Sequence, residues 1–105
     1  MAKQKFNLNP NPTFKAKVAI PVAGGKSADI EFTFKHRSKD ALKDFIDEMK
    51  EKEDLELLQD LVTGWDIDDP FDAESLEKLV QNYPGSALAI YQAYMVEMSG
   101  ARAKN

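Results

Sequence analysis

The feature that most limits the fold of this chain is a change in the spacing of its apolar residues after Arg37. Over residues 13–22 and again over residues 28–36, apolar side chains recur at every second position, which is typical of strands with one buried face. Between these two segments, Gly24 and Gly25 give the backbone the freedom that a tight reversal needs. From residue 38 onward, apolar side chains recur three and four positions apart, as in amphipathic helices. The sequence therefore predicts an α+β fold, with an antiparallel β-hairpin over residues 13–37 followed by a bundle of three to four helices over residues 38–100.

Capping and breaking residues divide the helical part. Four polar residues stand where they favour the start of a helix: Ser38, Asp54, Asp72 and Ser86. Gly64 is predicted to end the second helix and to lead into a loop over residues 65–71. The segment Tyr83-Pro84-Gly85 is expected to end the third helix, and Gly100 the last one. Because two strands alone are marginally stable in water, the helices or a neighbouring subunit must cover one face of the hairpin.

The length of 105 residues indicates one domain. Residues 1–12 are rich in asparagine and proline, which disfavour helices and central strands, so we expect a flexible N-terminal arm. Residues 13–105 are predicted to form a single α+β domain that ends in a polar tail over residues 101–105.

Charge is distributed unevenly along the chain. Residues 1–37 contain seven Lys and Arg against two acidic residues, a local charge of +5, whereas residues 38–105 carry −9, for a net charge of −4. This balance argues against non-specific nucleic-acid binding. Two interpretations of the asymmetry stay open: strands and helices use different surface residues, or the two parts attract each other, within one chain or in head-to-tail contacts between copies. No apolar run has the length of a membrane span or a secretory signal, so we expect no membrane association.

No set of residues forms a recognisable catalytic or metal-binding motif. The chain has no cysteine and one histidine, His36, which lacks partners for a metal site or a nucleophile. The run Gly24-Gly25-Lys26-Ser27 lacks the earlier glycine of a phosphate-binding loop and precedes a strand. Acidic residues with the spacing of calcium ligands occur in one segment, but Phe71 stands where that loop needs glycine. These acidic residues are Asp66, Asp68, Asp72 and Glu77. We therefore predict no catalytic residue, no metal and no cofactor, and expect that the protein is not an enzyme.

The last predicted helix, about residues 87–99, is apolar on nearly all sides. A chain of this size cannot easily bury every side of a terminal helix, so part of it is expected to contact a partner. The alternative is that this is the central helix of the bundle. Trp65 has the same two interpretations, as a core residue or as a binding residue. The predicted partner-binding residues are Trp65, Leu88, Tyr91, Tyr94, Met95 and Met98.

The order of these features resembles a known family. The hairpin ends in FTFKHR (residues 32–37), and an acidic helix follows it. The segments LVTGWD (61–66), FDAESL (71–76) and YPGSALAIYQAY (83–94) come next, and the chain closes with AKN (103–105). From about residue 13 to the end, this order resembles the tail assembly chaperones of long-tailed bacteriophages and prophages.

The resemblance implies a small protein of the host cytoplasm that acts during virion assembly and is absent from the mature virion. Its expected partners are the helical tape-measure protein and the tail-tube protein. Self-association into a homo-oligomer would multiply weak contacts along such an extended client. Two other classes stay open: an acidic adaptor or inhibitor that binds another host or phage protein, and an enzyme that uses acidic residues with a divalent metal.

Overall fold

The computed structural model describes residues 4–100, so the predicted polar tail over residues 101–105 lies outside the described residues. Two long strands come first, followed by four helices with a short strand between the second and third. In chain order the elements are β1 (Thr13–Val22), β2 (Lys26–Lys35), α1 (Lys39–Met49), α2 (Asp54–Leu61), β3 (Val62–Trp65), α3 (Ala73–Asn82) and α4 (Ser86–Ser99). This arrangement confirms the predicted α+β fold class.

The predicted hairpin is present in full. Strands β1 and β2 pair antiparallel from Thr13 opposite Lys35 to Val22 opposite Lys26. Gly24 and Gly25 turn the chain with φ values of 98° and 82°, which residues with a side chain rarely adopt. Strand β1 lies at an edge of the sheet, where the missing N–H of a proline within the strand costs no ladder hydrogen bond.

The sheet has a third strand that the spacing of apolar residues did not predict. Residues 62–65 pair antiparallel with β2, with Trp65 opposite Phe32, and the strand order is β1-β2-β3. The expectation that Gly64 ends a helix is therefore wrong, because α2 ends at Leu61 and the chain continues as a strand. The reason is long-range: the free edge of β2 offers backbone hydrogen bonds to whichever segment passes it, and four residues are too few to show a strand period.

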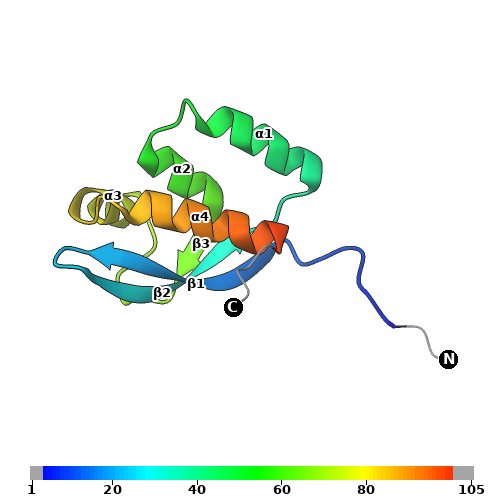
Figure 1. The fold of residues 1–105 in the computed structure, drawn as a ribbon, viewed down its shortest axis with the longest axis horizontal. Coiled ribbons are helices and arrows are strands. Elements are labelled where there is room, and N and C mark those ends of the chain that lie inside the picture. Colours follow the sequence, from blue (N-terminus) through cyan, green and yellow to red (C-terminus); the bar gives the residue numbers. More distant parts are fainter. Residues whose placement is uncertain (1–3, 101–105) are drawn as a thin grey trace.

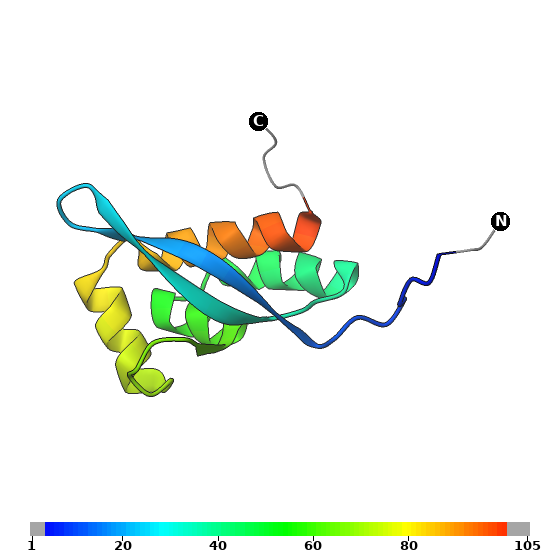
Figure 2. The same ribbon diagram turned by 90° about the horizontal axis from the view of Figure 1, so that it is seen from below.

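The helices cover one face of the sheet, as the two views of Figures 1 and 2 show. Helix α4 packs along β1, and α2 contacts both α4 and α3. Figure 1 places α1 outermost, on the side of α4 that faces away from the sheet. The core lies between the sheet and the helices. Its fully buried large side chains include Ile20, Phe32, Phe34, Leu58, Leu61, Leu76, Ile90 and Tyr94.

The predicted helix starts are confirmed for α1 and α3 and wrong for α2 and α4. The Ser38 hydroxyl accepts from the Ala41 amide at 3.2 Å, and the Asp72 carboxylate accepts from the Ser75 amide at 2.8 Å. Helix α2 is capped by Glu53, one residue before the predicted Asp54.

Helix α4 is capped by Gly85, and Ser86 is its first residue. The buried Ser86 hydroxyl donates instead to the Leu79 carbonyl at 3.5 Å, which ties α4 to α3. At Gly85, a Cβ atom would lie 3.3 Å from the Pro21 ring, so this glycine allows the start of α4 to approach β1 closely.

The predicted ends of α3 and α4 are confirmed. Helix α3 ends at Asn82, before the Tyr83-Pro84-Gly85 break. Gly100 follows α4 in the left-handed conformation, with φ of 67°, which is the usual role of a glycine after a helix.

Candidate partner-binding surface

Helix α4 has one buried side and one exposed side, although its sequence is apolar on both. Ser86, Ala87, Ile90 and Tyr94 are buried. On the opposite side, Leu88 is 60% exposed. An aliphatic side chain that is so exposed on a mainly apolar helix marks this side as the candidate binding surface.

Four of the predicted binding residues lie along one side of α4. Leu88, Tyr91, Met95 and Met98 stand at i, i+3, i+7 and i+10, which places them in one line along a helix. Tyr91, Met95 and Met98 are half-buried and pack partly against the core. We call these four residues the α4 stripe. Tyrosine and methionine combine large apolar area with adaptable shape, which favours contacts with another chain.

Tyr94 is not on the α4 stripe, because it is fully buried. Its ring lies among aromatic rings from three elements, with centroid distances of 5.5 Å to Phe34, 6.0 Å to Phe45 and 6.1 Å to Phe14. Its hydroxyl oxygen accepts from Arg37 Nη1 at 3.1 Å. Tyr94 is therefore a core residue that joins the sheet, α1 and α4, and the surface of the folded chain does not present it.

Arg37 and Phe45 attach α1 to the rest of the molecule. The Arg37 guanidinium lies 4.3 Å from the centroid of the Phe45 ring, and its Nη2 donates to the Asp60 carbonyl at 2.8 Å. The Phe45 ring also lies 6.4 Å from that of Tyr91 on the α4 stripe. Phe45 is the one buried residue of α1, and Leu42, Ile46 and Met49 are half-buried. Helix α1 thus adds apolar surface beside the α4 stripe.

A second link joins the end of α1 to α2. Lys52 forms an ion pair and hydrogen bond with Asp60, and its ammonium lies 3.9 Å from Glu48 at the end of α1. The hydrogen bond to Asp60 raises the pKa of Lys52 above its ordinary value, with help from the negative charges of Asp60 and Glu48. The contacts of Lys52 with Glu48 and Asp60 therefore link the end of α1 to α2.

Replacing Arg37 with methionine is expected to lower the free energy of unfolding by about 2 kcal/mol, because it removes two hydrogen bonds and the cation–π contacts with Phe45 and Tyr94. Lysine should recover little, since it cannot reach Tyr94 and Asp60 together in the planar geometry of a guanidinium. Urea unfolding of Arg37→Met, Arg37→Lys and the exposed control Lys39→Met would measure this. Equal stability of Arg37→Met and Lys39→Met would show that Arg37 does not attach α1.

Trp65 lies apart from the α4 stripe. It is on β3, at the opposite edge of the sheet from β1, on which α4 packs. The indole Nε1 donates to the Asp69 carbonyl at 2.9 Å, and the ring stacks edge-on against Phe71 at 5.1 Å. Trp65 borders a cavity of about 230 Å³, whose apolar lining also includes Ile67, Leu79 and Tyr83. The structure thus separates the predicted binding residues into two surfaces.

Replacing Trp65 with alanine is expected to cost about 2–3 kcal/mol of unfolding free energy, at the lower end for a large aromatic residue, because the ring is only half-buried. Thermal unfolding followed by circular dichroism would measure the loss, with the exposed Ile67→Ala as the control. A loss below that of Ile67→Ala would show that the indole makes no stabilising contact with Phe32 and Phe71.

The polar residues singled out in the sequence have structural roles. The Asp66 carboxylate accepts from the Glu31 amide at 3.0 Å, and Asp72 caps α3. The backbone amide of His36 donates to the Pro12 carbonyl at 2.8 Å and so extends the hairpin by one hydrogen bond. Within residues 4–100, no three acidic or histidine side chains are grouped closely enough to hold a metal ion. No helix in the same range is long and apolar enough to cross a membrane.

The fold and its surfaces define a small α+β protein in which helices cover one face of a three-stranded sheet and the last helix carries an apolar stripe. A family model described as phage tail assembly chaperone matches residues 1–105. The chain therefore belongs to the phage tail assembly chaperone family, which confirms the resemblance and extends it to residues 1–12. Searches of curated proteins and of solved structures each gave no match. The family implies a non-enzymatic role in tail assembly with protein partners.

Proposed function

We propose that this chaperone binds the tape-measure protein through the α4 stripe and keeps it soluble while tail-tube subunits assemble around it. The work takes place in the host cytoplasm, the chaperone is absent from the mature virion, and it catalyses no reaction. The observation that carries this proposal is the α4 stripe, a line of apolar side chains beginning at the exposed Leu88.

The spacing of the α4 stripe suits a helical client. Side chains at i, i+3, i+7 and i+10 form a ridge that fits between the side chains of a second helix. The α4 stripe also adjoins α1 through the contact of Tyr91 with Phe45, so a bound helix would meet apolar groups from both elements. A partner that is itself long and helical can repeat this contact along its length.

The charges around the α4 stripe favour clients with basic residues beside their apolar face. Helix α1 exposes four acidic residues against two lysines, Lys39 and Lys43, and residues 38–105 carry −9 overall. Such charges steer a basic partner and keep the complex in solution. The tail-tube protein is the second proposed partner, and the cavity beside Trp65 is available for it, because this cavity lies on a separate surface.

The proposal is tested by co-expressing the chaperone with the tape-measure protein of the same genome. We expect the tape-measure protein to be soluble with the chaperone and insoluble without it, and the two to co-purify. Titration calorimetry with tape-measure segments would then locate the helical contact. If the tape-measure protein gains no solubility and the chaperone co-purifies with a basic nuclease or repressor instead, the acidic adaptor or inhibitor function is the correct one.

A further inference from the structure

The N-terminal arm presents two apolar side chains away from the folded body. Residues 4–12 run outward from the start of β1 in both views (Figures 1 and 2). Phe6 and Leu8 are 76% and 82% exposed. Pro10 and Pro12 restrict the backbone, and the Asn7 side chain accepts from the Asn9 amide at 3.0 Å. The arm thus loses little conformational entropy when it docks, and its exposed side chains gain from burial.

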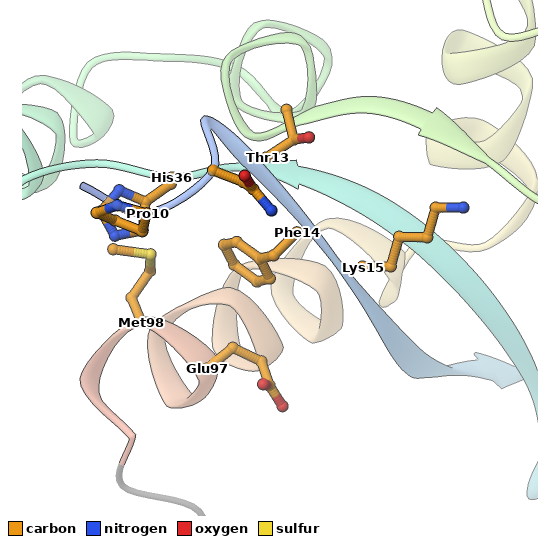
Figure 3. Close-up of a pocket in the computed structure, with 8 residues that line it drawn as sticks. Pro10, Thr13, Phe14, Lys15, His36, Glu97 and Met98 are labelled. Carbon is orange, nitrogen blue, oxygen red and sulfur yellow. The ribbon is translucent and has the colours of Figure 1, made fainter. Parts of the chain in front are cut away.

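A cavity of about 470 Å³ lies at the base of this arm. Phe14 and Met98 provide its apolar surface, and Figure 3 shows their side chains near His36 and Pro10, with the Lys15 ammonium directed away from them. The Phe14 ring stacks on Phe34 at 5.5 Å, so this wall of the cavity is supported by the core. A cavity of this size has room for the two apolar side chains that the arm exposes.

The chain's own arm leaves from the rim of this cavity. Pro10 and Asn11 form part of the lining, and the residues before them continue outward. A second copy is therefore the better source of the occupant.

We propose that two copies exchange their N-terminal arms, each placing Phe6 and Leu8 in the cavity beside Phe14 of the other. Arm and cavity adjoin on one chain, so a two-fold axis near Pro10 forms both contacts at once. Phe6 lies four positions before Pro10, and these four steps of the chain span roughly 13 Å when extended, which requires the two cavities to face each other closely. The dimer does not rest on the proposed binding of the tape-measure protein.

Sedimentation of the whole chain over a range of concentrations tests the exchange. We expect a dimer, and a dimer dissociation constant at least about tenfold higher in Phe6→Ser/Leu8→Ser, because two exposed side chains lose their burial on association. Leu88→Ser is the matched control, since it removes an exposed apolar side chain from α4 and should leave the dimer unchanged. A monomeric wild type, or a dimer weakened by Leu88→Ser and not by the arm variant, overturns the proposal.

Cross-linking between introduced cysteines tests which copy supplies the arm. The chain contains no cysteine of its own, so only the introduced thiols can form a disulfide. Leu8→Cys protein, carrying a tag that changes its mass, is mixed with Thr13→Cys protein under mild oxidation. We expect a covalent heterodimer, and none when exposed Ala41→Cys on α1 replaces Thr13→Cys. If the mixture gives no heterodimer and the double variant Leu8→Cys/Thr13→Cys forms only a disulfide within one chain, the arm folds back on its own body and the exchange is wrong. Binding of the tape-measure protein, measured separately, keeps the two proposals distinguishable.

Discussion

Replacing Tyr94 with alanine is expected to lower the free energy of unfolding by about 3–5 kcal/mol, the range for truncating a buried aromatic residue. The Tyr94 ring is fully buried and contacts the rings of Phe14, Phe34 and Phe45. Its loss would leave a cavity where the sheet, α1 and α4 meet. Urea unfolding followed by the fluorescence of Trp65, the one tryptophan in the chain, would measure the change.

The conservative variant Tyr94→Phe separates the two contributions of this residue. It keeps the ring and removes the hydroxyl that accepts from Arg37 at 3.1 Å, so we expect a loss of about 1 kcal/mol. If Tyr94→Ala left the stability nearly unchanged but abolished binding of the tape-measure protein, Tyr94 would be a binding residue, and the packing described above would be wrong.

Replacing Tyr91 and Met95 together with serine is expected to weaken binding of the tape-measure protein by about 2–4 kcal/mol, or roughly 30-fold to 1,000-fold in dissociation constant. Both side chains lie in the middle of the α4 stripe, where truncation at an interface costs most. They are half-buried in the free chain, so we also expect a smaller loss of stability. Titration calorimetry on the folded variant, checked by circular dichroism, would measure the effect on binding.

The matched control for this double variant is Ile67→Ser. Ile67 is an exposed apolar residue beside the Trp65 cavity, on a different surface from the α4 stripe. We expect Ile67→Ser to leave binding of the tape-measure protein unchanged. If Ile67→Ser abolished this binding and the Tyr91/Met95 variant retained it, the cavity beside Trp65 would be the site and the α4 stripe would not.

Much of the fold could be predicted because its signals are local. The hairpin needs only alternating side chains and two glycines, and both lie within residues 13–37. Helix starts at Ser38 and Asp72 were predicted correctly, because the capping side chain bonds an amide three residues away. The starts of α2 and α4 were wrong by one residue. At α4, Ser86 donates to the Leu79 carbonyl, a contact that the sequence does not reveal.

The sequence identified the helix that carries the candidate site, but it did not show which residues of that helix lie on the surface. The apolar sequence of α4 predicted that the helix has both buried and exposed apolar residues, and the predicted binding residue Leu88 is exposed in the structure. It could not distinguish Tyr91 from Tyr94, because both are aromatic and the helix has no polar side to set its orientation. The contact with β1 and the hydrogen bond from Arg37 direct Tyr94 inward.

The sequence by itself determined the local structure: a hairpin, the helical segments after it and the absence of a recognisable catalytic motif. It also supplied the apolar residues that a binding surface needs. The tertiary structure alone decided that residues 62–65 add a third strand, that Trp65 and α4 lie on separate surfaces, and that a cavity opens at the base of the arm. The physical reason is that these features depend on pairing and packing between segments far apart in the chain, which the spacing of residues within one segment does not record.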